Sequence, residues 1–330
     1  ILVSHDLGVI ANICNKIIVM KDGIIQEIGN KHQIINNPQK EYTKELINSY
    51  SKNDYIENGF NDNSKDIVFD VKNLNVNWKK TNIFNYFNNK KMSNTSVGIV
   101  DVSLKIFKGN RVGIVGESGS GKSTLAKAII NIQKPSNGEI YFNKNNLMNL
   151  NKDQTIKMRQ DVQMIFQDPY SSLNPKSTIR KLLIEPLKFL KITNKANYEK
   201  KIVELIFKVG LDNKFLDKYP HQLSGGQCQR VNIARALSVN PKILIADEPT
   251  SSLDVTIQAQ IIELIINLCK KMELTLIFIS HDLRVVKNIC NKIIVMKGGK
   301  IIESGSTYEV FHKTKNTYTK ELITSVLSIN

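Results

Sequence analysis

The feature that most constrains the fold is the sequence GESGSGKST at residues 116–124. It fits the phosphate-loop pattern, in which two glycines separated by four residues are followed by lysine and then serine or threonine. An apolar run at 112–115 precedes it, and a helix-favouring run at 125–130 follows it. A chance match in a chain of this length has a probability of roughly 1%. An ordinary glycine turn is therefore the weaker interpretation, and the segment predicts a strand, loop and helix of an α/β fold.

The residue types in this loop suit a chain of phosphates. Glycine lets backbone N–H groups approach anionic oxygens closely, and the following helix adds its positive N-terminal end. Lys122 is expected to reach the β and γ phosphates, and the Ser123 hydroxyl to ligate Mg²⁺. The expected ligand is ATP with Mg²⁺. The residues expected to contact it are Gly116, Glu117, Ser118, Gly119, Ser120, Gly121, Lys122, Ser123 and Thr124.

A second element, KILIADEP at residues 242–249, ends a short apolar run with two carboxylates. Such a run suits a buried parallel strand, whose C-terminal end faces the ligand crevice of an open α/β sheet. Asp247 is expected to hold Mg²⁺, and Glu248 to polarise the attacking water. Two exposed acids that merely end a strand are common, but after a phosphate loop this is the less favoured interpretation.

With LSGGQ at residues 223–227, these motifs resemble those of the ATP-binding cassette (ABC) ATPases, in the family's order. The resemblance covers residues 66–325. The sequences YPHQLSGGQ, FQDPYSSLNP and ADEPTSSLDVTIQAQ are similar to those of the branch of the family that powers import of dipeptides, oligopeptides, glutathione or nickel. The fold class that the resemblance implies is α/β: a P-loop NTPase nucleotide-binding domain with an antiparallel β subdomain and a helical subdomain.

The resemblance also implies an ATP site shared by two cassettes that bind head to tail. In this arrangement the phosphate loop of one cassette and the LSGGQ signature of the other enclose each nucleotide. The signature residues are thus expected to contact ATP held by a partner. The residues carried over for this contact are Ser224, Gly225, Gly226 and Gln227, with Asp254 of the SLD sequence at 252–254.

Three further roles come from the same resemblance. Gln167, in MIFQDPYSSLNP, is expected to sense Mg²⁺ and the attacking water. His281, in SHD at 280–282, is expected to hydrogen-bond the γ-phosphate, although a lone histidine is more often structural. Trp78 aligns with the aromatic residue that stacks on adenine, although three other aromatic residues lie in a nearby insertion. The expected catalytic set is thus Glu248, His281 and Gln167, and the expected metal ligands are Ser123, Gln167 and Asp247.

An internal repeat bears on the domain organisation. Residues 1–49 match 277–325 without a gap, and about 27 of the 49 paired positions are identical. A repeat of this kind indicates a duplicated module. We expect residues 1–50 to be the C-terminal remnant of a first cassette, 51–65 a polar linker, and 66–330 a complete second cassette. The chain then resembles the C-terminal part of a tandem two-cassette protein.

Composition limits the classes of partner. The net charge is +16, but the lysines occur singly or in pairs, without the blocks of a basic tail, so no nucleic-acid partner is expected. No run of about 18 apolar residues is present, so no transmembrane helix is expected, and the resemblance implies integral membrane permease subunits as partners. The resemblance adds a second cassette, from another copy or the same chain, and an extracytoplasmic solute-binding protein that acts indirectly. The expected location is the cytoplasmic face of the cell membrane.

The sequence therefore predicts the ATP-hydrolysing subunit of a peptide-type importer. Two alternatives stay open at this point. The first is a tandem cassette ATPase that acts on ribosomes or DNA, although such proteins usually have a long charged linker or zinc-ligand cysteines, and neither is found here. The second is an inactive fragment of the transporter ATPase that retains its motifs.

Overall fold

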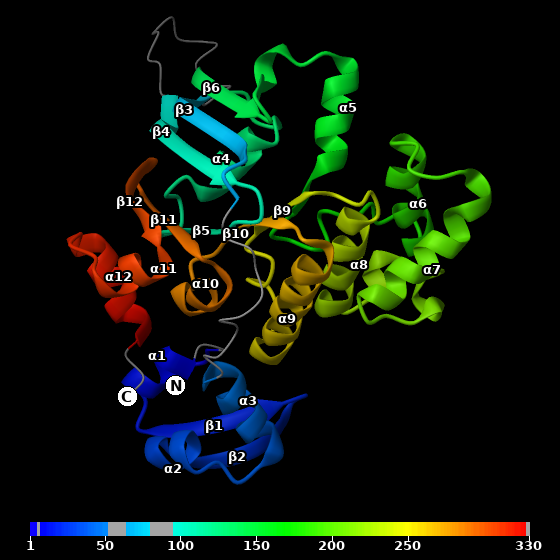
Figure 1. Cartoon of the computed structure of the whole chain (residues 1–330). Coiled ribbons are helices and arrows are strands. Elements are labelled where there is room, and N and C mark those ends of the chain that lie inside the picture. The colour runs from blue at the N-terminus through cyan, green and yellow to red at the C-terminus, as the bar shows by residue number, and fades with distance from the viewer. Residues whose placement is uncertain (5–6, 52–63, 80–94, 328–330) are drawn as a thin grey trace, which may run out of the picture.

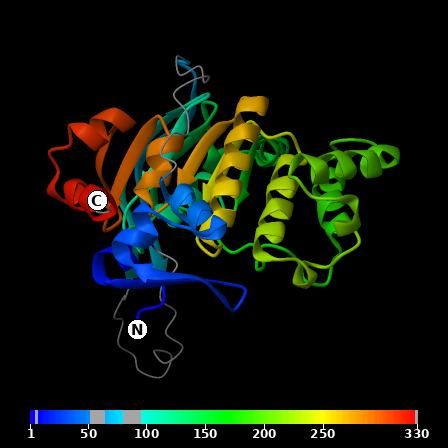
Figure 2. The same cartoon turned by 90° about the horizontal axis from the view of Figure 1, so that it is seen from below.

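The structure is a computed structural model that describes residues 1–4, 7–51, 64–79 and 95–327 (Figure 1). Most of the predicted linker and most of the insertion near 79–96 lie outside these residues. The described residues form two sheets with their helices, a helical region to one side, and a small N-terminal unit (Figures 1 and 2). Among them, no helix has the length and apolar character needed to cross a bilayer.

The central sheet has six strands in the order β12-β11-β5-β10-β9-β8. All neighbours are parallel except β12, which pairs antiparallel with β11. Its strands are β5 (Arg111–Val115), β8 (Val162–Ile165), β9 (Ile243–Asp247), β10 (Thr275–Ile279), β11 (Lys292–Lys297) and β12 (Lys300–Ser306). Every residue of β5, β9 and β10 is buried, as expected for apolar strands covered on both faces.

Alternate residues of these strands feed two separate cores. Ile243 and Ile245 of β9 pack in one core with α4 (Lys122–Ile129) and with the second sheet. Leu244 and Ala246 pack in the other core with helices on the opposite face. This alternation is the period-two geometry of a strand. The core that contains Leu244 and Ala246 includes residues of helices α8 (Gly225–Leu237), α9 (Val255–Met272) and α10 (Leu283–Ile289).

The second sheet is antiparallel and has the order β4-β3-β6-β7. Its strands are β3 (Ile67–Lys79), β4 (Thr95–Phe107), β6 (Asn137–Phe142) and β7 (Asn145–Asn146). The buried side chains of β3, β4 and β6 share a core with α4 and the central sheet, so α4 is held between two sheets (Figure 1). A 3-10 turn (Leu147–Asn149) and α5 (Lys152–Asp161) lead from this sheet to β8.

The helical region lies between β8 and α8 in the sequence and projects to one side of the sheets (Figure 2). It contains α6 (Ile179–Phe189), α7 (Tyr198–Lys208) and three 3-10 turns (Lys195–Asn197, Asn213–Phe215, Pro220–Gln222). Apolar faces of α6 and α7 pack against α8 in the core. Arg180 of α6 ties this region together through ion pairs with Glu199 and with Asp217, the latter at 2.9 Å. The predicted combination of α/β core, antiparallel sheet and helical region is thus observed.

The N-terminal unit repeats the architecture of the C-terminal one. It consists of α1 (Leu7–Ile13), β1 (Lys16–Lys21), β2 (Ile24–Asn30), α2 (Lys31–Asn36) and α3 (Glu41–Ser51). The C-terminal counterpart is α10, β11 and β12 followed by α11 (Thr307–His312) and α12 (Thr317–Leu327). Both hairpins have the same register, with an irregularity after Val19 in one and after Val295 in the other. The sequence repeat therefore corresponds to a structural repeat.

The two copies differ in what covers their first strand. Ile294 and Met296 of β11 are 6% and 0% exposed, because their side chains pack in the core with α4 and the antiparallel sheet. Their counterparts Ile18 and Met20 of β1 are 54% and 56% exposed. The N-terminal unit has its own small core around Ile34, and its α3 contacts α9 of the main body.

Candidate active site

The predicted phosphate loop connects β5 to α4 at the C-terminal edge of the central sheet. Gly116, Gly119 and Gly121 have φ of 148°, 80° and 101°, values that side-chain-bearing residues rarely adopt. A Cβ on Gly116 would lie 2.2 Å from the carbonyl oxygen of Met296. Gly116 is therefore required both by its backbone conformation and by the close contact with β11, whereas Gly119 and Gly121 are required by their backbone conformations.

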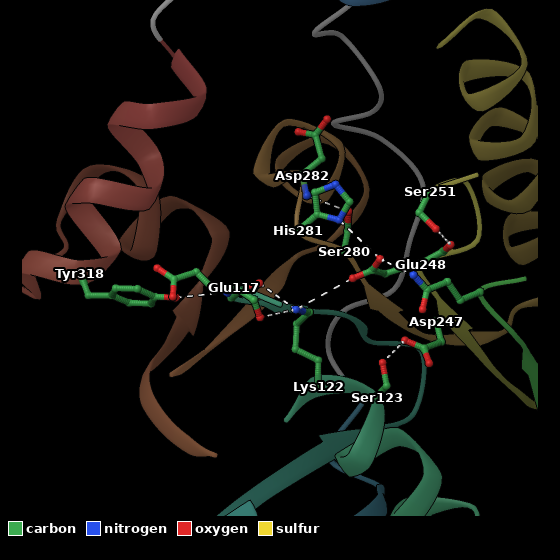
Figure 3. Close-up of polar contacts among 12 residues, drawn as sticks. Glu117, Lys122, Ser123, Asp247, Glu248, Ser251, Ser280, His281, Asp282 and Tyr318 are labelled. Atoms are coloured by element: carbon green, nitrogen blue, oxygen red, sulfur yellow. Dashed lines mark hydrogen bonds and ion pairs between the residues drawn. The ribbon is translucent and has the colours of Figure 1, made fainter. Parts of the chain in front are cut away.

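Lys122 stands at the start of α4 and turns back over the loop (Figure 3). Its Nζ donates hydrogen bonds of 2.8 Å to the carbonyl oxygens of Gly116 and Glu117, and lies 4.0 Å from a carboxylate oxygen of Glu248. The side chain is only 4% exposed, and this burial lowers the pKa of the ammonium group. A largely desolvated cation thus lies beside the backbone of the loop.

Ser123 and Asp247 bring two oxygen atoms together (Figure 3). The Ser123 hydroxyl at the start of α4 donates a 2.8 Å hydrogen bond to the Asp247 carboxylate at the end of β9. Asp247 is 3% exposed, and burial raises the pKa of its carboxyl group. Hydroxyl and carboxylate oxygens are the hard ligands that Mg²⁺ prefers. The pair fits one side of a magnesium site.

Glu248 follows β9 directly and has a left-handed backbone, with φ of 43°. Its N–H donates to the carbonyl oxygen of Ile279 at the end of β10, at 3.0 Å. Such a conformation costs free energy in a residue with a side chain and is found mainly at functional sites. It aims the Glu248 carboxylate away from the path of the strand and toward the residues of two other loops.

The Glu248 carboxylate is the meeting point of those loops. Its Oε2 accepts a 3.1 Å hydrogen bond from Gln167 Nε2 and lies 3.5 Å from His281 Nδ1. The hydrogen bond with His281 lowers the pKa of Glu248 and raises that of His281. The structure thus brings together the three predicted catalytic residues, which come from separate parts of the sequence.

An open cavity lies above the phosphate loop. It is lined by Gly98, Ser118, Gly119, Gly121, Lys122, Ser123, Thr124, Gln167 and Glu248. Three predicted loop residues, Gly116, Glu117 and Ser120, do not contribute to this lining. Ser120 is instead buried, and its carbonyl oxygen accepts the N–H of Gly299 from the turn between β11 and β12. The cavity combines a cation, a hydroxyl and a carboxylate, which suits phosphate transfer to water.

The LSGGQ signature lies elsewhere, at the start of α8. Ser224 is exposed and forms a capping box with Gln227, in which each side chain accepts the other residue's backbone N–H. Gly226 packs against α9, where a Cβ would lie 2.6 Å from a methyl carbon of Ile257. None of the signature residues lines the cavity described above, and Asp254 is exposed at the start of α9.

Trp78 lies in β3, and its side chain is outside the described part of the structure, so the predicted adenine contact is not seen. Two residues that the sequence did not predict contact the cavity or the signature. Gly98 of β4 lines the cavity, and the Tyr170 hydroxyl donates a 2.9 Å hydrogen bond to the carbonyl oxygen of Leu223 in the signature. The position of Tyr170 three residues after Gln167 was the only signal for it in the sequence.

Known proteins resemble this chain along most of its length. The family model described as ABC transporter matches residues 99–251, and the model described as oligopeptide/dipeptide transporter, C-terminal region, matches residues 26–68. The oligopeptide transport ATP-binding protein OppF of Haemophilus influenzae is 45% identical over 265 residues, which are 80% of this chain and 79% of that protein.

Two further similarities concern a longer relative and a solved structure. The peptidoglycan transport ATP-binding protein YejF of Agrobacterium fabrum is 36% identical over 333 residues, which cover 100% of this chain and 59% of that protein. The dimeric ATP-binding cassette MJ0796, solved with ADP and phosphate, matches with a TM-score of 0.63 and 31% identity, over 72% of this chain and 98% of that one. The chain belongs to the family of ABC transporter ATP-binding proteins, ATPases that bind and hydrolyse ATP.

Proposed function

We propose that this chain hydrolyses Mg-ATP to power an importer of peptides or similar solutes. The observation that carries the proposal is the convergence of Lys122, Ser123 with Asp247, and Glu248 with Gln167 and His281 around one cavity. The solute class follows from relatives whose names give transport of oligopeptides or glutathione. The same relatives disfavour a ribosome- or DNA-directed ATPase.

Each residue has a proposed part in hydrolysis. The Lys122 ammonium and the N–H groups of the loop and of the first turn of α4 would balance the phosphate charge. Ser123 and Asp247 would hold Mg²⁺, which would supply positive charge to offset the charge of the phosphates. Glu248 would accept a proton from the attacking water, while Gln167 and His281 fix the direction of its carboxylate. The depressed pKa of Glu248 keeps this carboxylate ionised at neutral pH.

We propose that a second cassette completes the site. Ser224 is exposed at the positive N-terminal end of α8, which suits contact with a phosphate presented from outside the chain. Gly225 and Gln227 beside it are partly exposed, Gly226 is buried against α9, and Asp254 is exposed at the start of α9. The partner cassette would come from a second copy or from the same polypeptide.

The domain organisation remains a proposal: a tail of a first cassette at residues 1–50, a linker at 51–65 and a complete cassette at 66–330. Three observations support it. The N-terminal unit repeats the fold and register of the C-terminal one. The transporter C-terminal region model matches at 26–68, ahead of the cassette model. The longer relative YejF aligns with the whole of this chain over 59% of its own length.

The proposed partners follow from the same family. They are integral membrane permease subunits, contacted at the cytoplasmic face of the membrane, with an extracytoplasmic solute-binding protein acting through them. Affinity purification of the tagged chain from solubilised membranes should therefore recover permease subunits. Peptide uptake by intact, sealed vesicles of the same membranes should require ATP and should fail with Glu248→Gln. Recovery with ribosomes, and without membrane subunits, would contradict the proposal.

A further inference from the structure

A tyrosine from the C-terminal tail reaches the phosphate loop. The Tyr318 hydroxyl, at the start of α12, accepts a 3.2 Å hydrogen bond from the backbone N–H of Glu117 (Figure 3). The two residues are separated by 201 positions in the sequence, and Tyr318 is 6% exposed. Burial of the phenol raises its pKa, so the hydroxyl keeps its proton at neutral pH.

The Tyr318 side chain is held in place by its own surroundings. Lys297, at the end of β11, places its Nζ 4.1 Å from the centre of the tyrosine ring. The Asn316 side chain accepts hydrogen bonds from the backbone N–H groups of Tyr318 and Thr319, at 3.0 Å and 3.3 Å. The Lys297 ammonium over the ring and the Asn316 cap at the start of α12 hold the tyrosine ring in place independently of its contact with the phosphate loop.

The peptide unit that joins Gly116 to Glu117 is held at both of its polar ends. Its N–H, from Glu117, donates to Tyr318, and its carbonyl oxygen, from Gly116, accepts a 2.8 Å hydrogen bond from Lys122 Nζ. Rotation of this peptide unit would therefore move one of the two carbonyl acceptors of the lysine that faces the cavity. Glu117 itself does not line the cavity, so its N–H is free to bind the tyrosine without competing for phosphate.

The same lysine–tyrosine arrangement occurs in both copies of the repeat. Lys21 places its Nζ 4.6 Å from the centre of the Tyr42 ring, as Lys297 does for Tyr318. The pair is therefore a property of the tail module itself. In the C-terminal copy, the module joins this preformed phenol to a phosphate loop.

We propose that Tyr318 is a positioning residue that holds the phosphate loop in its ATP-binding conformation. The inference rests on the proposed function in one respect, namely that this loop binds ATP. The tail thereby becomes part of the nucleotide site, although it lies after the residues 99–251 that match the cassette model. The second contact from the same region, Gly299 N–H to the Ser120 carbonyl oxygen at 3.0 Å, holds the middle of the loop in the same way.

The test is Tyr318→Phe, which keeps the ring over Lys297 and removes only the acceptor. Loss of one hydrogen bond predicts about a three- to tenfold rise in the Kd and KM for ATP, with kcat within about twofold. Hydrogen exchange gives a second readout that needs no nucleotide: the Glu117 amide should lose protection, while the Leu125 amide, bonded to the Gly121 carbonyl oxygen, keeps it. The matched control is Tyr308→Phe in α11, whose side chain is exposed.

The outcomes separate this inference from the proposed function. If the parent chain binds ATP and Tyr318→Phe binds it within about twofold of the parent and of Tyr308→Phe, Tyr318 does not position the loop. Unchanged protection of the Glu117 amide would overturn the inference as well, whatever the affinity. A parent chain that binds no ATP would overturn the proposed function and this inference together.

Discussion

Glu248 combines a strained backbone with a crowded carboxylate. Its φ of 43° is maintained by the Ile279 hydrogen bond and places the carboxylate within reach of Gln167, His281 and Lys122. The interaction with His281 lowers the pKa of Glu248, so this carboxylate stays ionised at and below neutral pH.

Replacement of Glu248 by glutamine tests its role as the proton acceptor. The amide retains the size and most hydrogen-bonding capacity of the side chain but removes its basicity. We expect kcat for ATP hydrolysis to fall by at least about 100-fold, with the Kd for ATP within a few-fold of the parent. Hydrolysis at the parent rate would exclude Glu248 as the base.

Ionised Asp247 is expected to destabilise the folded chain. Burial raises the pKa of Asp247, so ionisation of this carboxylate opposes folding, and its cost appears as pH rises through the ordinary aspartate range. Asp247→Asn should therefore raise the Tm of the nucleotide-free chain at pH 7, less so near pH 4, and should abolish Mg²⁺-dependent hydrolysis. Exposed Asp153→Asn is the control. A lowered Tm at pH 7 would show that the carboxylate is net stabilising.

The His281–Glu248 pair defines a pH window. The raised pKa of His281 contributes stability below its unfolded value of 6.5, and this is lost as pH rises through the folded pKa. The lowered pKa of Glu248 contributes above 4.5 and is lost as pH falls. The Tm difference between the parent and His281→Ala should thus be largest between these values. In a Glu248→Gln background the pH dependence should disappear; if it persists, another group is responsible.

At the level of elements, the signature helix depends on close contact with its neighbour. Alanine normally stabilises a helix relative to glycine, by about 1 kcal/mol. At Gly226 we expect the reverse, a loss of about 1–3 kcal/mol, because the added Cβ would lie 2.6 Å from an Ile257 methyl carbon and push α8 from α9.

Thermal or urea unfolding of the single and double variants checks this. Gly225→Ala is the matched control, since its Cβ would meet only the mobile end of Leu253, at 3.0 Å. Ile257→Ala removes the Cγ2 methyl that the added Cβ would meet, so Gly226→Ala should cost less stability in an Ile257→Ala background than in the parent. Equal effects of Gly225→Ala and Gly226→Ala would argue that the α8–α9 contact is not the cause.

The elements that the sequence predicted well are those specified by local patterns. The phosphate loop and the acidic strand each follow from the spacing of residues or from an apolar run within a short segment. The contacts that were not predicted join distant segments, as with Tyr318 and Glu117 or Tyr170 and Leu223. Such pairs depend on how the elements pack, which no short segment specifies. The left-handed backbone of Glu248 is hidden for the same reason, because Ile279 of another strand maintains it.

On the scale of the whole molecule, two strands of identical sequence have different surroundings. The segment KIIVMK occurs in both β1 and β11, yet Met20 is 56% exposed and Met296 is fully buried. The difference arises because β11 lies in the central sheet and Met296 packs in the core between this sheet and the antiparallel sheet, whereas Met20 lies outside the small core of the N-terminal unit. The exposed strand is consistent with the proposed origin of the N-terminal unit as the tail of another cassette.

The signature and the phosphate loop also occupy separate places in one chain. The signature begins α8 beside the helical region, whereas the phosphate loop begins α4 beneath the antiparallel sheet (Figure 1). In the proposed mechanism, a second cassette brings its own signature to this loop. Hydrolysis should therefore depend on association as well as on the residues around Glu248.

The most direct test of the central claim is the ATPase rate of the purified chain as a function of its concentration, with Glu248→Gln measured alongside. We predict a rate per chain that rises with concentration until pairing saturates, and that is lost in the variant. A rate per chain that is constant down to the lowest concentrations, where no dimer is detected, would contradict the shared site. Equal rates in the parent and Glu248→Gln would contradict the assignment of the catalytic centre.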